Sequence, residues 1–138
     1  MSDAVVLDAS AAMRAVMDGA AQPALLDCLC AATTILAPTL LRAEVGNALW
    51  KYQRSGVISL AEALRRHEEA VGIVHLLIDD SSLFPEALSL AAEMNHPVYD
   101  ALYAVTARRH AAMLLSFDQR LHALCQRAGI PSTLLSAL

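Results

Sequence analysis

The chain has 138 residues, of which 57% are hydrophobic and 17% charged, and this composition excludes an intrinsically disordered protein. Its length suits one domain, residues 1–138, that buries a real core. The uncharged stretch at residues 28–41 is too short for a transmembrane helix. The N-terminus lacks the basic region of a signal peptide, and we expect a cytoplasmic protein.

The net charge of −4 does not suggest a nucleic-acid partner. If four of the fourteen acidic residues face a metal ion, however, ten acidic and ten basic side chains remain. Global charge therefore neither supports nor excludes nucleic acid. The three cysteines, Cys28, Cys30 and Cys125, lack metal-ligand spacing, and we expect them to be reduced and in or near the core.

Short apolar runs alternate with helical patterns along the chain, which predicts a parallel sheet flanked by helices and thus an α/β fold. Helix signals include Gly19 and Gly129 as C-caps, Pro23 in a first turn, and Ser59 with Glu62 as a capping box. In chain order, the pattern predicts a strand at 5–7, helices at 9–19 and 23–31, a strand at 35–37, helices at 40–54 and 59–70, a strand at 73–78, helices at 81–93 and 98–110, a strand at 113–117, a helix at 119–127 and an edge strand at 133–135.

Four acidic residues lie at or near the ends of these elements: Asp8, Glu44, Asp100 and Asp118. Each has an ordinary structural explanation. Asp8 and Asp118 stand where a strand gives way to a helix and can serve as N-caps, and Asp100 suits the first turn of its helix. Glu44 can belong to an exposed polar strip with Asn47, three residues later on the same helix face.

The four positions taken together also predict a metal site. In an open parallel sheet, ligands bind in the crevice beyond the carboxyl ends of the strands, where Asp8 and Asp118 are expected, with the hydroxyls of Ser10 and Ser116 beside them. Carboxylates that converge repel one another and require a cation. Oxygen ligands without His or Cys suit Mg²⁺ or Mn²⁺.

Four segments around these residues resemble the motif blocks of PIN-domain ribonucleases, most closely the VapC-type toxins of toxin–antitoxin pairs. The resemblance spans nearly the whole chain. Each block alone has low specificity, but the four occur in the expected order at typical distances. They read VVLDAS at 5–10, PTLLRAEVGNAL at 38–49, VYDALYA at 98–104 and LSFDQRL at 115–121.

The resemblance places Asp8, Glu44, Asp100 and Asp118 on the acidic positions of the family's metal site, and it places Ser10 and Asn47 on polar positions beside it. Ser116 stands where many members carry Thr, and both offer a hydroxyl. The resemblance implies a PIN-like three-layer α/β/α sandwich with a mostly parallel sheet of four to five strands. It also implies Mg²⁺- or Mn²⁺-dependent cleavage of RNA to 5′-phosphate and 3′-hydroxyl ends, a homodimer and a cognate VapB-like antitoxin.

Other side chains have two possible roles each. Arg14, Arg42, Tyr99 and Tyr103 are candidate RNA contacts, although solvated arginines are the default. Trp50 and Tyr52 are expected to be packing residues. Met13 and Met17 form an apolar strip that is either core or a groove for a partner helix. None of the five histidines has ligand spacing, and His75 is expected to be buried and hydrogen-bonded.

Two other classes of function stay open. A phosphoacceptor signalling module would also use an acidic Mg²⁺ pocket, but it needs a lysine at the end of a late strand, and the only lysine, Lys51, lies in a predicted helix. A non-catalytic binding module would share the fold, although none of the four acidic positions is missing. A dinucleotide-binding enzyme is poorly supported because the isolated glycines make no GxGxxG motif.

Overall fold

Five parallel strands form a single sheet in the computed structural model, which describes residues 3–136. The spatial order is β3-β2-β1-β4-β5. Val6 of β1 pairs with Leu36 of β2 and with Leu114 of β4, so β1 lies between these two strands. From β1 the chain adds β2 and β3 on one side and then β4 and β5 on the other, so the strand order reverses between β1 and β4. The strands are β1 (Ala4–Leu7), β2 (Thr34–Pro38), β3 (Leu76–Ile78), β4 (Met113–Ser116) and β5 (Ser132–Leu134).

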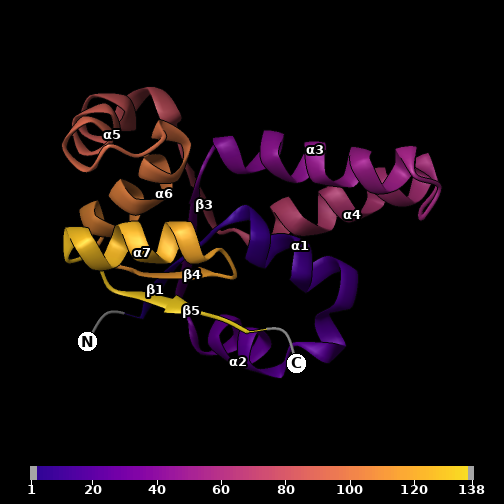
Figure 1. The fold of residues 1–138 in the computed structure, drawn as a ribbon. Coiled ribbons are helices and arrows are strands. Elements are labelled where there is room, and N and C mark those ends of the chain that lie inside the picture. The colour runs from indigo at the N-terminus through magenta and orange to yellow at the C-terminus, as the bar shows by residue number, and fades with distance from the viewer. Residues whose placement is uncertain (1–2, 137–138) are drawn as a thin grey trace.

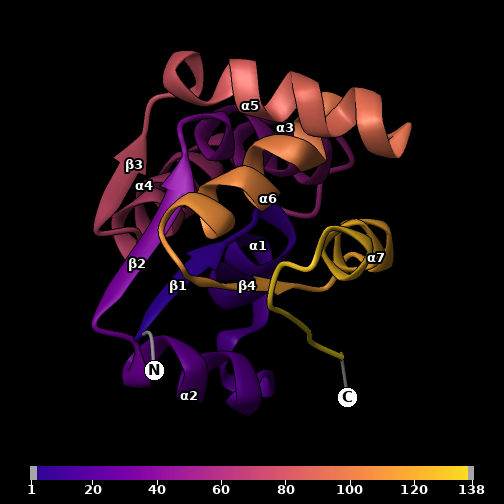
Figure 2. The ribbon, with the colours of Figure 1, turned by 90° about the vertical axis from the view of Figure 1, so that its left-hand side faces the viewer.

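Helices cover both faces of the sheet, which confirms the predicted three-layer α/β/α sandwich. Helices α5 and α6 lie on one side and α2 on the other, while α3 and α4 form a pair that extends beyond the sheet (Figures 1 and 2). The helices are α1 (Ala9–Asp18), α2 (Pro23–Ala31), α3 (Leu40–Arg54), α4 (Leu60–Ile73), α5 (Asp80–Met94), α6 (Val98–Arg109) and α7 (Gln119–Ala128), with a short 3₁₀ turn η1 (Gly19–Ala21) after α1.

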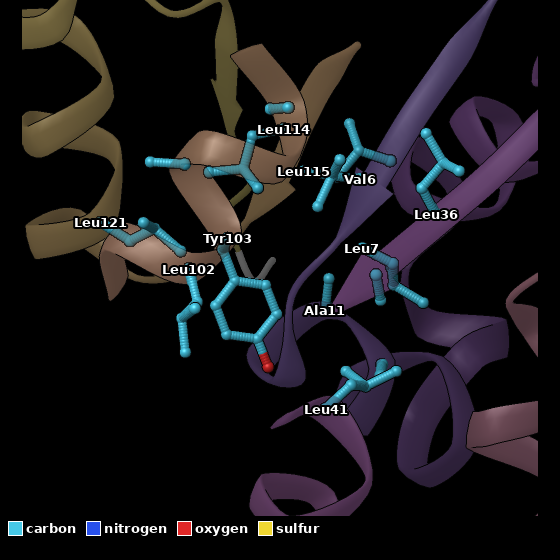
Figure 3. Packing of buried hydrophobic residues seen from close by; sticks show 14 of the residues in the cluster. Val6, Leu7, Ala11, Leu36, Leu41, Leu102, Tyr103, Leu114, Leu115 and Leu121 are labelled. Carbon is cyan, nitrogen blue, oxygen red and sulfur yellow. The ribbon is translucent and has the colours of Figure 1, made fainter. Parts of the chain in front are cut away.

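The core is built mainly of leucine and alanine. Helix α6 is buried over seven consecutive residues, Ala101 to Ala107, because it crosses β1, β2 and β4 in the middle of one face. Figure 3 shows how the leucines of the strands and helices meet around it. The largest fully buried side chains are Leu7, Leu25, Leu41, Leu49, Leu83, Leu90, Leu102, Leu114, Leu115, Leu121, Leu124 and Val6.

Most predicted elements are present within one or two residues, but the strand expected at 73–78 is much shorter. Helix α4 continues to Ile73, and β3 begins only at Leu76. An apolar run does not by itself distinguish a buried helix end from a strand. His75 is hydrogen-bonded as expected, since its Nδ1 accepts from the Ile35 N–H at 2.9 Å, but it is exposed rather than buried.

The helix-end signals agree with the structure in most respects. Gly19 is the C-cap of α1 as expected, although its φ of −53° is right-handed and it also opens η1. Gly129, at φ 72°, is a left-handed C-cap of α7. Ser59 caps α4 through the Glu62 N–H, but the Glu62 carboxylate pairs with Arg65 and Arg66.

Three side chains expected to pack inside lie at the surface. Cys30 is exposed, while Cys28 is half-buried and Cys125 is buried. Trp50 is 49% exposed and Tyr52 is 41% exposed, because α3 extends past the sheet and only one of its sides is covered. Within residues 3–136, none of the helices is long and apolar enough to cross a membrane. The domain limits 1–138 stay a prediction, and their outermost residues lie outside the described range.

Candidate metal and nuclease site

The carboxylate of Asp8 lies at the point where the sheet order reverses, between the carboxyl ends of β1 and β4. Its Oδ1 accepts from the Ser10 hydroxyl at 2.7 Å and from the Ala11 N–H at 2.8 Å, so Asp8 is the N-cap of α1. Its Oδ2 accepts from the Ser116 hydroxyl at 2.5 Å. Asp8 therefore both caps α1 and places its carboxylate in the crevice beyond the strand ends.

Two serines connect Asp8 to the segment that follows β4. The Ser10 hydroxyl accepts from the Phe117 N–H, and the Ser116 hydroxyl accepts from the Asp118 N–H, both at 2.9 Å. Each serine thus donates to Asp8 and receives from the backbone beside Asp118. These hydrogen bonds fix the two ends of the strands relative to each other, and they bear out the expected position of Ser10 and Ser116 next to Asp8.

Asp8 is only 3% exposed, and its pKa is raised from 3.8 to about 6. Burial is the largest cause, because it penalises the ionised form. The hydrogen bonds from Ser116, Ala11 and Ser10 lower the pKa, and the negative charge of Asp118 raises it. Among the residues that the structure describes, no lysine or arginine forms an ion pair with this buried carboxylate.

Glu44 projects from α3 and is held by a tyrosine on another helix. The Tyr103 hydroxyl donates to Glu44 Oε1 at 2.6 Å, and Tyr103 is 2% exposed. Figure 3 shows this ring within the leucine core, with its hydroxyl at the edge of the core. The expectation that Tyr103 contacts RNA is wrong, because its ring is covered. Tyr99, one turn earlier, is 59% exposed and stays a candidate.

The pKa of Glu44 is raised, chiefly by burial. The Tyr103 hydrogen bond lowers it, while the charges of Asp100, Asp118 and Asp80 raise it. The charges of two of the other three predicted site residues therefore raise the pKa of Glu44, and the charge of Asp118 raises the pKa of Asp8. This mutual influence is what converging carboxylates produce.

Asp100 lies in the first turn of α6 and has a histidine partner. His96 Nε2 is 2.7 Å from Asp100 Oδ2, and both side chains are largely buried. His96 lies in the loop before α6, so the four-residue spacing of helix neighbours does not predict this pair from the sequence. His96 can hold the Asp100 carboxylate in a defined orientation, as the serines do for Asp8 and Tyr103 does for Glu44.

A fifth acidic residue near the site, Asp80, was not singled out from the sequence. Its Oδ1 accepts from the Leu40 N–H at 3.0 Å, and its own N–H donates to Thr39 Oγ1 at 3.1 Å. Asp80 thus satisfies a free donor at the start of α3, one helical turn before Glu44. Its role in the structure is to join the starts of α3 and α5.

The donor set fits a divalent cation. None of the ion pairs formed among residues 3–136 brings a lysine or arginine to Asp8, Glu44, Asp100 or Asp118. Across those same residues, no three His, Cys, Asp or Glu side chains lie close enough to enclose a metal as they stand. Burial and neighbouring negative charges raise the pKa values of Asp8 and Glu44, and such carboxylates are groups that a hard cation stabilises.

The remaining expected residues differ in their positions. Asn47 lines a cleft together with Glu44. Arg14 lies over the Phe117 ring at 5.1 Å and pairs with Asp18 at 3.6 Å, so it stays near the site. Arg42 is exposed, and its charge lowers the pKa of Asp79 at the start of α5.

Comparisons with known proteins agree with this geometry. The sequence pattern of the PIN domain family matches residues 5–126, a range that includes all four acidic positions. Exonuclease VapC9 of Pyrobaculum aerophilum is 35% identical over 95 residues, which cover 69% of this chain and 70% of that protein. Ribonuclease VapC3 of the same organism is 34% identical over 80 residues, or 56% and 61% of the two chains. The crystal structure of PAE2754 from Pyrobaculum aerophilum has a TM-score of 0.69 at 28% identity, covering 93% of this chain and 82% of that one.

Proposed function

The chain belongs to the PIN-domain family and is a VapC-type ribonuclease by its relatives, and from this premise we propose that it is a metal-dependent endoribonuclease and the toxin of a toxin–antitoxin pair. One observation carries the chemistry. Asp8, buried and with a raised pKa, lies between the ends of β1 and β4, and the charge of Asp118 contributes to that raised pKa. Within residues 3–136 it has no lysine or arginine partner.

Asp8, Asp100 and Asp118 would hold one or two Mg²⁺ or Mn²⁺ ions, with Glu44 as a direct ligand or acting through water. A bound divalent ion supplies an activated water and neutralises charge on the phosphoryl oxygens. The chain's own contribution is orientation. Ser10 and Ser116 fix Asp8, and His96 and Tyr103 fix Asp100 and Glu44.

The competing functions have less support. A phosphoacceptor needs a lysine at a late strand end, and Lys51 lies in the last turn of α3. The strand order 3-2-1-4-5 also differs from the 2-1-3-4-5 order of CheY-like signalling domains. A purely binding module would not need a raised pKa at Asp8, since a neutral polar residue would cap α1 without the penalty of burying a charge.

The two named relatives make the mode of cleavage the first matter to test, since one is called an exonuclease and the other a ribonuclease. The purified protein with Mn²⁺ should open a circular single-stranded RNA, because an endonuclease needs no chain end. The product should carry a 5′-phosphate, and EDTA should stop the reaction. Degradation of linear RNA with the circle left intact would show an exonuclease, and no cleavage of either would contradict the proposed function.

Two exposed apolar surfaces support the proposed partners. Phe84 and Leu88 are exposed one turn apart on α5, and this apolar surface suits a second copy of the chain. A groove of about 300 Å³ between α3 and α4 suits an amphipathic helix of the antitoxin, because Trp50, Leu60 and Leu64 are among its lining residues. Light scattering should give twice the 14.7 kDa chain mass for the wild type and the mass of one chain for Leu88→Glu. A monomeric wild type would contradict the dimer.

A further inference from the structure

A cleft of about 530 Å³ begins at Glu44 and follows α3 away from the sheet. Ala9 of α1 forms part of its opposite wall. The lining residues of α3 recur every three or four positions, so they form one continuous stripe on the helix. They are Glu44, Asn47, Ala48, Lys51 and Tyr52, followed by Ser55 at the end of the helix.

A second hollow of about 260 Å³ continues this cleft on the α1 side. Tyr52 lines both hollows, and Met13, Arg14, Met17 and Asp18 form the rest of the second one. Both methionines are half-buried, since each packs against the core and also lines the hollow. Together the two hollows make one groove between α1 and α3 that leads out from Glu44, here called the α1–α3 groove.

The α1–α3 groove presents the groups that bind single-stranded nucleic acid. Lys51 is exposed and, within the part of the chain that the structure describes, forms no ion pair. The Tyr52 side chain is 41% exposed, which leaves part of its ring free for a base. Lys side chains bind phosphates, and stacking on aromatic rings is the common way to hold unpaired bases.

We propose that the α1–α3 groove binds the nucleotides of single-stranded RNA adjacent to the cleaved phosphate, with Lys51 on a backbone phosphate and Tyr52 under a base. This inference rests on the proposed ribonuclease function, because Glu44 ends the groove at the candidate metal site. The amide of Asn47 and the hydroxyl of Ser55 are available for hydrogen bonds to ribose or base edges.

RNA fits this groove better than a partner helix does. An amphipathic helix needs apolar anchors along one line, and the α3 wall offers instead an amide, an ammonium group and a hydroxyl between Glu44 and Ser55. The apolar anchors lie on the other side of α3, where Trp50 faces Leu60 and Leu64. The two sides of α3 therefore present different chemistry to different partners.

Single-turnover cleavage of a fluorescein-labelled linear RNA of mixed sequence, with protein in excess, separates binding from the chemical step. Tyr52→Ala should raise the half-saturating protein concentration about tenfold or more, the size of one lost base stack, while Tyr52→Phe should retain wild-type affinity. Lys51→Ala should weaken binding and reduce the slope of log affinity against log salt by about 0.7–1. A loss of stability alone would not change the salt slope.

Matched controls are available on the same protein. Trp50→Ala removes a larger exposed ring from the other side of α3, and Arg108→Ala removes an exposed positive charge from the far end of α6. Both should bind RNA as the wild type does. If the wild type cleaves RNA but the Lys51 and Tyr52 variants match the controls, the groove proposal is overturned while the ribonuclease stands. If the wild type cleaves no RNA, the proposed function itself has failed.

Discussion

Replacing Asp8 with Asn should abolish RNA cleavage and, in metal-free protein at neutral pH, raise the melting temperature. Asparagine keeps the size of the side chain and caps helices as well as Asp does. Loss of a metal ligand should reduce the rate by at least about 10³-fold, more than the 10–100-fold typical when an outer partner of a ligand is removed. Activity and stability should therefore change in opposite directions.

The stability change depends on pH in a defined direction. The pKa of Asp8 is about 6 in the folded protein against 3.8 when unperturbed, so between these values the folded state binds more protons than the unfolded state. The free energy of unfolding therefore falls as pH rises from about 4 to about 6, by roughly 3 kcal/mol at 1.36 kcal/mol per pKa unit. Asp8→Asn removes this penalty, so the gain should be present at pH 7.5 and absent at pH 4.

Thermal unfolding in EDTA at both pH values, together with an RNA cleavage assay in Mn²⁺, measures the two effects. Asp3→Asn is the matched control, because Asp3 is an exposed carboxylate just before β1 and its change should alter neither quantity. Undiminished cleavage by Asp8→Asn would exclude the metal role of Asp8. An equal stability gain at pH 4 and pH 7.5 would show that packing rather than charge burial explains the change.

Millimolar Mn²⁺ should raise the melting temperature of the wild type by about 10 °C at neutral pH. A ligand at 100 times its dissociation constant stabilises the fold by about 2.7 kcal/mol if it does not bind the unfolded chain, and each kcal/mol shifts the melting temperature of a domain of this size by roughly 3–5 °C. The ion would also relieve the repulsion that Asp100 and Asp118 exert on Glu44.

Three variants define the source of that shift in a calorimetric titration. Asp100→Asn should lose most of it, while Tyr103→Phe, which removes the hydroxyl holding Glu44 but no charge, should retain a smaller shift. Glu93→Gln removes an exposed carboxylate of α5 and should leave the shift unchanged. A melting temperature that does not respond to Mn²⁺ in the wild type would contradict convergence of the four carboxylates.

Local patterns determined most of the elements. Periodicity and end signals are properties of a few neighbouring residues, so Gly129 and the junctions at Asp8 and Asp118 predicted helix limits correctly. The predicted strand at 73–78 was too long, because a buried helix end and a strand have the same apolar composition. The all-parallel sheet followed from the alternation of strands and helices, since parallel strands require crossover connections.

The α/β class, the family resemblance and the choice of the four acidic positions could all be predicted from the sequence, because each depends on residue type, spacing and order along the chain. Only the tertiary structure placed β1 beside β4, which brings Ser116 within hydrogen-bonding distance of Asp8 across 108 positions of sequence separation. The tertiary structure also showed that Tyr103 is buried and Tyr99 exposed, although the two lie on the same face of α6. Tyr103 lies a turn deeper, beneath α3, where its hydroxyl meets Glu44, while Tyr99 lies at the uncovered start of α6. Strand order and burial depend on how distant segments pack, and local spacing carries no information about either.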